Sequence, residues 1–343
     1  MKKENLMNEE VKHADIKSFD STPIIDAFEG MAFQARNLVA AAKIYDRMIS
    51  NSNCTIILCL SGSLFSAGLK KVVSEMVQNN MVDVIVSTGA IVVDQDFFEA
   101  LGFRHCRRSP LVNDEMLNKM GIDRIYDTFI DENQLRECDM VVAKIADYLP
   151  PRPYSSREFI WEMGKYLSDE KKNPKSVVLE CYKKGVPIFV PAFSDCSAGF
   201  GLVYHQRERG DKPKVAIDSV RNFLELTKVK ARAKDTGLVM VGGGVPKNFA
   251  QDVTIATDIL GDRANMHKYA IQITLADERD GGLSGSIIKE GYSWGKVDRG
   301  FEQMVFCEAT IAFLLIASYA YHMGNWKKRS PKNYDKVLAE VMK

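Results

Sequence analysis

Continuous apolar runs that alternate with helical patterns most restrict how this chain can fold. The apolar runs are predicted to be strands at 54–60, 81–87, 186–192, 213–217, 237–242 and 269–274. Helical periodicity occurs between and before them, at 31–49, 68–80, 131–149, 155–170, 218–232 and 247–258. Strands without a polar face belong in a sheet that is covered on both sides. The alternation therefore predicts an α/β fold, Rossmann-like and doubly wound, with a mostly parallel sheet and helices on both faces.

The chain shows no linker that would divide it into separate domains. Its strongest local break, LPPRPYSS at 149–156, is short and flanked by helical patterns. We expect a helical N-terminal extension at 1–30, one domain at 31–325 and a polar C-terminal tail at 326–343. The apolar run at 309–321 is too short to span a bilayer and is predicted to be a buried helix.

The charge balance argues against nucleic acid and membranes as partners. Lysine plus arginine number 46 and aspartate plus glutamate 45, which leaves a net charge of +1. Seven cysteines are scattered without a CxxC pair, and the N-terminus lacks a hydrophobic signal core, so we expect a soluble cytoplasmic protein. Five histidines show no metal-binding spacing, and no metal site is predicted.

Three glycine-containing turns follow predicted strands. Their sequences are LSGSLFSAG (60–68), VSTGAIVVDQD (86–96) and VGGGVPKNF (241–249). Backbone amides at such strand ends, with a helix start behind them, suit a phosphate or pyrophosphate group. One such turn is more often only a tight connection, but three in one chain favour a ligand. None matches GxGxxG, so the sequence predicts a nucleotide held in a different arrangement.

The segment EGYSWGKV at 290–297 places Lys296 two residues after Trp294. Burial disfavours the charged form of a lysine, and a neutral amine can form a Schiff base with a carbonyl or imine carbon. Trp294 could face a cation, and Glu290 could hold a substrate ammonium. The alternative is a lysine that covers the tryptophan with its aliphatic stem and keeps its charge in water.

EGYSWGKV resembles the active-site segment of the deoxyhypusine synthase family, in which the lysine after SWG carries a covalent imine. It is also similar to homospermidine synthases, which derive from the same family. Other segments resemble the family in the same order: LSGSLFSAG, NMVDVIVSTGA, GIDRIYD, PAFSDCSAGFG, VGGGVPK and YAIQITLADERDGGLSG. The resemblance covers nearly the whole chain, from about residue 20 to residue 322.

The resemblance implies a Rossmann-like single domain that binds NAD and forms a homotetramer of dimers, with active sites at the dimer interface. It also implies an alkyl transfer from a polyamine. Spermidine is oxidised with NAD, its aminobutyl group moves to the lysine as 1,3-diaminopropane leaves, and an acceptor amine takes the group before reduction. The acceptor is a translation-factor lysine for deoxyhypusine synthase and putrescine for homospermidine synthase.

Matching the family's motifs assigns roles to individual positions of this sequence. Lys296 would carry the imine, and Glu290, Trp294 and Asn248 would contact the polyamine. The positions that would contact NAD are Ser63, Ser66, Thr88, Gly89, Ala90, Asp195, Gly242, Gly243, Gly244, Ala276, Glu308 and Ala309. As alternatives, Asp195 could only cap a turn, and the three consecutive glycines could serve only the turn.

The sequence departs from the family mainly at substrate positions. Phe200 and Leu283 stand where the family has aspartates, Asn248 replaces a histidine, and Ser63 replaces an asparagine. A buried ammonium without a counter-charge is costly, so spermidine would be poorly held at one end. Acids elsewhere could compensate, and the candidates are Asp94, Asp96, Asp277 and Asp280. Asparagine cannot titrate, which leaves open the group that moves protons in place of the histidine.

We therefore expect an NAD-dependent aminobutyl or aminoalkyl transferase of polyamine metabolism that works through a Lys296 imine, with a small amine as acceptor. A deoxyhypusine synthase that acts on a translation-factor lysine is the second hypothesis. The third is a homologue that binds NAD and forms a tetramer without catalysis. Phe200, Leu283 and Asn248 fit this third hypothesis, but the intact EGYSWGK does not require it.

Overall fold

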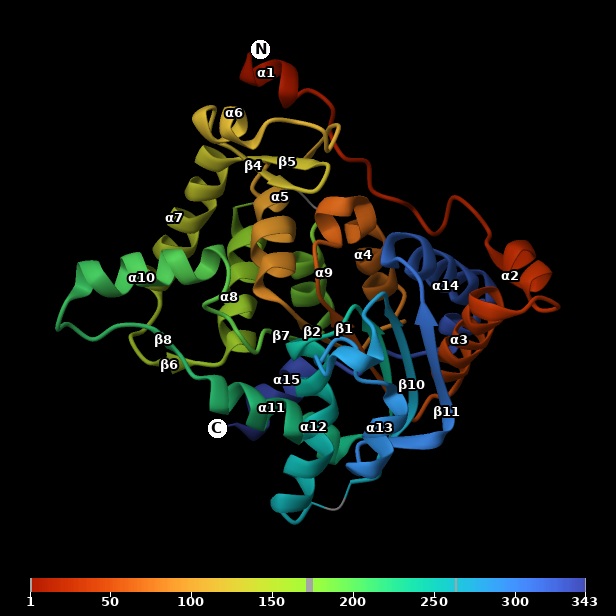
Figure 1. The fold of residues 1–343 in the computed structure, drawn as a ribbon. Helices are drawn as coiled ribbons and strands as arrows, with labels where there is room; N and C mark the ends of the chain where they lie inside the picture. Colours follow the sequence, from red (N-terminus) through yellow and green to blue (C-terminus); the bar gives the residue numbers. More distant parts are fainter. Residues whose placement is uncertain (1, 171–174, 263, 343) are drawn as a thin grey trace.

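The computed structural model describes residues 2–170, 175–262 and 264–342, and its centre is a parallel β-sheet (Figure 1). Within these residues the sheet has six strands in the order β11-β10-β9-β1-β2-β7, and every neighbouring pair is parallel. The strands are β1 (Cys54–Leu60), β2 (Val84–Ser87), β7 (Ile188–Phe189), β9 (Asp235–Val241), β10 (His267–Thr274) and β11 (Val297–Phe306). Helices lie on both faces, so the predicted Rossmann-like α/β fold is confirmed.

The order of strands reverses between β1 and β9, which makes this boundary the topological switch point of the sheet. The chain builds β1, β2 and β7 toward one edge and then β9, β10 and β11 toward the other. Leu60, the last residue of β1, pairs in register with Ser87 of β2 and with Val241 of β9. The three strands therefore end at one level, and their glycine turns begin side by side where α/β proteins bind ligands.

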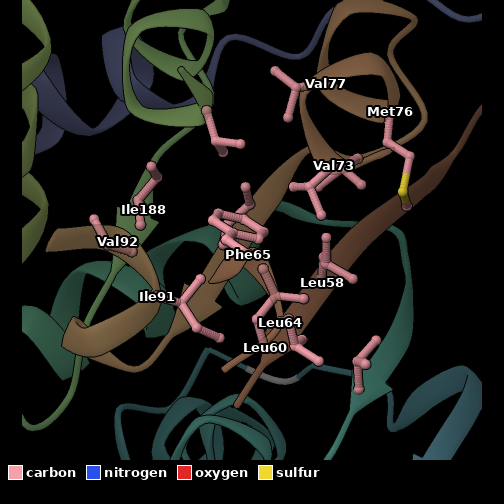
Figure 2. Packing of buried hydrophobic residues seen from close by; sticks show 14 of the residues in the cluster. Leu58, Leu60, Leu64, Phe65, Val73, Met76, Val77, Ile91, Val92 and Ile188 are labelled. Atoms are coloured by element: carbon pink, nitrogen blue, oxygen red, sulfur yellow. The ribbon is translucent and has the colours of Figure 1, made fainter. Parts of the chain in front are cut away.

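Alternate residues of β1 enter two different hydrophobic cores, which is why the strand has no polar face. Leu58 and Leu60 belong to one core, part of which Figure 2 shows, and Ile57 and Cys59 belong to the other. The first core includes α3 (Phe33–Ser50), α4 (Lys70–Gln78), α8 (Ser156–Asp169), α9 (Val177–Lys184) and α14 (Ala309–Met323). The second includes α11 (Ser219–Arg232), α12 (Val245–Ile259), α13 (Ile288–Ser293) and α15 (Tyr334–Val341).

Two smaller sheets lie outside the central sheet. One is antiparallel and contains β3 (Cys106–Arg107), β5 (Thr128–Asp131) and β4 (Ile122–Ile125), and the other pairs β6 (Pro153–Tyr154) with β8 (Ala216–Ile217). The strand predicted at 213–217 is therefore shorter than expected and does not belong to the central sheet. In contrast, β11 is absent from the predicted strands, because VDRGFEQMVF forms a partly exposed edge strand with charged residues.

The other helical segments connect these elements. They are α1 (Lys3–Leu6), α2 (Thr22–Phe28), η1 (Phe65–Leu69), η2 (Ala90–Phe97), α5 (Phe98–Ala100), α6 (Asp114–Lys119), α7 (Glu132–Tyr148), α10 (Ser197–Arg209), η3 (Glu278–Asp280) and η4 (Asn325–Lys328). The apolar run at 309–321 falls within α14, whose inner side is buried. Among the described helices, none is both long and apolar enough to cross a membrane.

The C-terminal segment packs against the body of the protein, although we expected 326–343 to be a polar tail. Tyr334 and Leu338 of α15 are buried in the second core. The guanidinium of Arg329 lies 2.6 Å from the carboxylate of Asp83, and both side chains are almost fully buried. Apolar side chains spaced along α15 thus anchor a segment that reads as polar overall.

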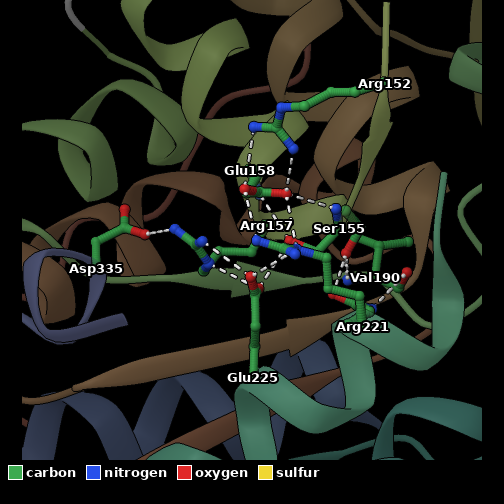
Figure 3. A network of polar contacts seen from close by, with 10 residues as sticks. Arg152, Ser155, Arg157, Glu158, Val190, Arg221, Glu225 and Asp335 are labelled. Atoms are coloured by element: carbon green, nitrogen blue, oxygen red, sulfur yellow. Dashed lines mark hydrogen bonds and ion pairs between the residues drawn. The ribbon is translucent and has the colours of Figure 1, made fainter. Parts of the chain in front are cut away.

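An ion-pair network fixes α15 to its neighbours (Figure 3). Arg157 of α8 donates hydrogen bonds to Glu225 of α11 at 2.8 Å and to Asp335 of α15 at 2.6 Å. At the other end of the chain, Ile25 in the expected N-terminal extension is also buried in the first core. The outermost residues of the expected extension and tail, 1 and 343, lie outside the described residues.

Candidate active site

The three glycine turns line one cavity of about 410 Å³ at the switch point. Gly62, Gly242 and Gly244 adopt positive φ angles there, which glycine reaches without strain. The lining comes from the ends of several central strands and from nearby loops: Ser61, Gly62, Ser87, Thr88, Gly89, Pro191, Ala192, Asp195, Gly242, Gly243, Gly244, Val245, Pro246, Thr274 and Ser284. The strand ends therefore meet as the sequence predicts.

The backbone around this cavity is closely packed. A Cβ atom at Gly89 would lie 2.4 Å from Cys196 Sγ, and one at Gly243 would lie 2.4 Å from Ser284 Cα. Helix α12 begins directly after Gly244, and no side chain of the described residues caps its start. Free amides at a helix start attract anionic groups, so this end of the cavity suits a phosphate.

Part of the predicted NAD set lines this cavity. Thr88, Gly89, Asp195, Gly242, Gly243 and Gly244 are in the lining. The remaining predicted positions lie outside it: Ser63, Ser66, Ala90, Ala276, Glu308 and Ala309. The structure thus brings the second and third turns together with Asp195, whereas the first turn contributes Ser61 and Gly62 instead of Ser63 and Ser66.

The positions outside the lining have other partners. Ser66 is buried and its hydroxyl donates to the Ser63 carbonyl at 2.9 Å, which shapes the first turn. Glu308 accepts the Thr310 amide at 2.8 Å and caps α14. The others are placed by their elements: Ala90 begins η2, Ala276 follows β10 and Ala309 begins α14. Strands β10 and β11 end at the same edge of the sheet as the glycine turns, so Ala276, Glu308 and Ala309 lie on that edge. They are farther from the switch point, because β10 and β11 lie beyond β9 in the strand order.

Lys296 lies in a second cavity of about 530 Å³ beside α12 and α13. Its side chain is 12% exposed, and its Nζ lies 2.5 Å from Asp252 Oδ1 and 5.2 Å from the centre of the Trp294 ring. Glu290 and Asn248 line the same cavity. The structure therefore brings together every position that the sequence suggested for the imine carrier and the polyamine.

Asp252 is a candidate functional residue that the sequence patterns did not reveal. Its Oδ2 accepts a hydrogen bond from Asn248 Nδ2 at 2.8 Å, one turn earlier on α12. The amine of Lys296 thus faces a carboxylate from α12. The i, i+4 spacing shows from sequence that Asn248 and Asp252 share a helix face. Their position beside Lys296 depends on long-range packing.

Lys247 holds the segment that separates the two cavities. Its amine donates hydrogen bonds to the Leu283 carbonyl at 3.2 Å and to the Ser286 hydroxyl at 2.8 Å, and it also contacts the Ser286 carbonyl. Burial lowers the pKa of Lys247 to about 8. Leu283 and Ser286 line the Lys296 cavity, whereas Ser284 between them lines the glycine cavity. The two cavities are therefore neighbours.

Two of the acids proposed to compensate for missing family carboxylates hold helix starts instead. Asp94 accepts the Ser197 amide of α10 at 2.8 Å, and burial raises the pKa of Asp94 to about 7. Asp96 is fully buried and accepts the Ser176 hydroxyl at 2.7 Å together with two amides at the start of α9. Neither residue lines the Lys296 cavity.

The other two proposed acids also point elsewhere. Asp277 forms an exposed ion pair with Arg279 at 2.7 Å, and Asp280 accepts the Gly282 amide at 2.6 Å. Of the two positions where the family has aspartates, Leu283 lines the Lys296 cavity, whereas Phe200 on α10 is 65% exposed and lines neither cavity. The carboxylates in the lining of the Lys296 cavity are those of two other residues, Asp252 and Glu290.

Comparison with known proteins identifies the family to which this chain belongs. The sequence profile of deoxyhypusine synthase matches residues 23–320. The chain belongs to the deoxyhypusine synthase family. Deoxyhypusine synthases are NAD-dependent aminobutyl transferases, and the predicted family resemblance is confirmed.

Relatives of deoxyhypusine synthase match over almost their full length. A deoxyhypusine synthase-like protein of Chlorobaculum tepidum is 56% identical over 98% of this chain and 97% of the relative. One of Coxiella burnetii is 54% identical over 99% of this chain and 97% of the relative. A Methanosarcina acetivorans relative named probable deoxyhypusine synthase 2 is 39% identical over 90% of this chain and 88% of the relative.

The fold is also similar to a solved structure of this family. The crystal structure of a proposed deoxyhypusine synthase from Entamoeba histolytica matches with a TM-score of 0.60. The match covers 91% of this chain and 97% of the other, at 16% sequence identity. At that identity the likeness supports the fold alone.

Proposed function

We propose that this deoxyhypusine synthase family member is an NAD-dependent transferase that moves an aminobutyl or related aminoalkyl group to a small amine. The group would be carried as an imine on Lys296, as in a homospermidine synthase-type reaction. The observation that carries the proposal is the position of Lys296. Its amine lies in a cavity next to the glycine-lined cavity, since Leu283 and Ser286 line the first and Ser284 between them lines the second.

The glycine-lined cavity fits a dinucleotide. Close packing at Gly89 and Gly243 brings backbone, not side chains, to the cavity wall. The Gly244 amide and the start of α12 would hold the pyrophosphate, and Asp195 would accept hydrogen bonds from ribose hydroxyls. NAD supplies a hydride acceptor for the oxidation of a donor amine and a hydride donor for the final reduction.

The Lys296 cavity fits a polyamine. Asp252 and Glu290 supply negative charge, and Trp294 offers an aromatic face to a cation. The same lining includes the apolar side chains of Ile255, Ile259 and Ile287. A lining that combines carboxylates with apolar surface suits a molecule in which ammonium groups alternate with methylene chains.

The residues that line the Lys296 cavity also favour one kind of acceptor for the transferred group. Leu283 takes the place of a family aspartate in the Lys296 cavity, so the polyamine is held differently from spermidine in deoxyhypusine synthase. This difference favours a changed substrate and a small amine acceptor. Transfer to a translation-factor lysine is the second candidate, and it is favoured by the name of the Methanosarcina acetivorans relative.

We further propose a cytoplasmic homotetramer of dimers with active sites at the dimer interface. Large apolar side chains are exposed beside the Lys296 cavity, where Ile259 is 80% exposed and Trp294 is 66% exposed. A second subunit over this opening would cover them and exclude water from the imine. All seven cysteines are free thiols, which suits a reducing compartment.

Borohydride trapping tests the proposed transfer. The protein is incubated with NAD and spermidine, reduced with borohydride and digested. The mass of the peptide that contains Lys296 is then measured by mass spectrometry. We expect an added aminobutyl group that is lost when putrescine is supplied before reduction. Discharge only by a translation-factor acceptor would favour the second candidate. Tight NAD binding without an adduct from any polyamine would contradict transfer and indicate a non-catalytic homologue.

A further inference from the structure

We propose that Asp252 carries the proton that Lys296 must lose before it can capture an imine or carbonyl carbon. This inference rests on the proposed function of Lys296 as the imine carrier. It assigns the proton-transfer group that the replacement of the family histidine by Asn248 left open.

The geometry places one carboxylate oxygen against the reacting nitrogen. Asp252 Oδ1 lies 2.5 Å from Lys296 Nζ, and within the described residues it has no hydrogen-bond partner of good geometry. Asp252 Oδ2 is held by Asn248 at 2.8 Å. One oxygen is thus fixed to the helix that bears it, and the other remains available to the amine.

The surrounding charges favour this assignment. In the part of the chain that the structure describes, Asp252 supplies the only carboxylate within 4.0 Å of the Lys296 amine. Glu290 of α13 lines the same cavity but is exposed, and the Lys247 ammonium of α12 acts electrostatically on both Glu290 and Lys296. Asn248 is the residue in the position of the family histidine, and its amide cannot titrate. Asn248 is therefore a positioning residue for Asp252.

The proton returns at the end of the exchange. Lys296 as an ammonium gives one proton to the Asp252 carboxylate and becomes a free amine. The amine nitrogen then bonds to the carbon of a protonated imine, and the departing nitrogen takes the first proton from Asp252. Asp252 takes a second proton from the Lys296 nitrogen, whose electron pair forms the new carbon–nitrogen double bond as the bond from that carbon to the departing amine breaks. The departing amine takes this second proton from Asp252, which regenerates the carboxylate. An arriving cationic imine favours the first step, because two positive charges at close range disfavour the ammonium.

A simple aldehyde tests this role without NAD or polyamine. Full-length protein is treated with propanal and cyanoborohydride near neutral pH, and the rate of alkylation at Lys296 is followed by peptide mass spectrometry. We expect Asp252→Asn to slow alkylation at least about tenfold. Added formate should restore part of the rate by accepting the proton in place of the missing carboxylate.

Faster alkylation of Lys296 in the Asp252→Asn variant would point to a different role for Asp252. If Asp252 were only a counter-ion, its removal would release free amine and alkylation of Lys296 would become faster. A faster or unchanged rate would overturn the proposal. The exposed Asp258 lies on the same helix, so Asp258→Asn is the matched control and should alkylate Lys296 at the original rate. Alkylation of the exposed Lys289 provides an internal reference in each sample.

Two further measurements separate folding and function from proton transfer. If Asp252→Asn fails to fold, Asp252→Ala is measured with and without formate, and a rate that formate leaves unchanged contradicts the proposal. The aldehyde reaction is also independent of the proposed transfer. A protein that forms the propanal adduct but no polyamine adduct would contradict the proposed function, while the rates of the Asp252 variants would still decide the role of Asp252.

Discussion

The amide of Gly243 donates a hydrogen bond to the hydroxyl of Ser61 at 2.8 Å, across the boundary between β9 and β1. This contact joins the third glycine turn to the first at the switch point. Both residues line the glycine cavity. The hydrogen bond therefore fixes the relative position of two turns that would have to hold the same nucleotide.

Ser61→Ala removes this hydrogen bond without adding bulk. We expect NAD affinity to fall about fivefold, since a typical hydrogen bond contributes roughly 1 kcal/mol. Isothermal titration calorimetry would measure the dissociation constant. Ser18→Ala is the control, because Ser18 is exposed and bonds only to its own N-terminal loop. Equal affinities for both variants would show that the contact between the turns does not organise the site.

Gly243→Ala places a methyl group where Ser284 lies 2.4 Å away. We expect a loss of about 1–3 kcal/mol in the free energy of unfolding, because the loop that bears Ser284 must move. Urea denaturation would measure it, and NAD binding should weaken as well. No atom lies within 4 Å of a Cβ at Gly30, so Gly30→Ala should leave both quantities unchanged. A fully stable Gly243→Ala protein would contradict the close packing described above.

Lys296→Ala should abolish transfer and leave the fold intact. The side chain contributes an amine at the edge of a cavity, and its backbone continues to bond to Gly291 and His267. We expect circular dichroism, oligomeric state and NAD affinity to match those of the original protein, while the borohydride-trapped adduct disappears. An unfolded Lys296→Ala protein would instead indicate that the ion pair with Asp252 is structural.

Asp94→Asn should change how stability depends on pH. Burial raises the pKa of Asp94 to about 7 from an ordinary value of 3.8, so the folded protein binds a proton more tightly than the unfolded chain. The contribution of Asp94 to stability is therefore present below the unfolded pKa and is lost as pH rises toward 7. The variant should gain stability relative to the original protein between pH 4 and pH 7. Urea denaturation at several pH values would measure this difference, and a constant difference would exclude it.

Arg329→Ala should destabilise the protein strongly. The Arg329 side chain is 3% exposed and pairs with the equally buried Asp83. Its removal leaves a buried carboxylate unpaired, which typically costs about 3–5 kcal/mol. Urea denaturation would measure the loss, and Lys328→Ala at the neighbouring exposed position should change stability little. A loss no larger than that of Lys328→Ala would show that the Arg329–Asp83 pair does not stabilise the protein.

The central sheet was predictable where burial alone shapes the strand. Both faces of β1 and β9 are covered, so CTIILCL of β1 and GLVMV of β9 read as apolar runs. The edge strand β11 is not recognisable as an apolar run, because residues such as Asp298 and Arg299 stay exposed. The prediction that the run at 213–217 belongs to the central sheet was wrong, because a short apolar stretch does not specify which strand it pairs with. Ala216 pairs with Pro153 outside the main sheet.

The candidate site was predictable only in part. The glycine turns and the carrier segment each have a local signature, and the register of parallel strands brings the turns to one level. Asp252 has no such signature, because its meeting with Lys296 joins residues that are far apart in sequence. Likewise, the acidic character of Asp94 and Asp96 does not show that they bond to helix starts, since Ser197 and Ser176 come from distant segments.

The shared register of Leu60 with Ser87 and Val241 ties ligand binding to strand length. A one-residue deletion in β1 would retract its turn by roughly 3.3 Å relative to the two beside it. The same deletion would exchange which side chains enter each core, since successive residues point to opposite faces. A length change within any of these three strands would therefore disturb both the ligand-binding turns and the packing of the two cores. We expect natural insertions and deletions in this family to occur in the outer loops.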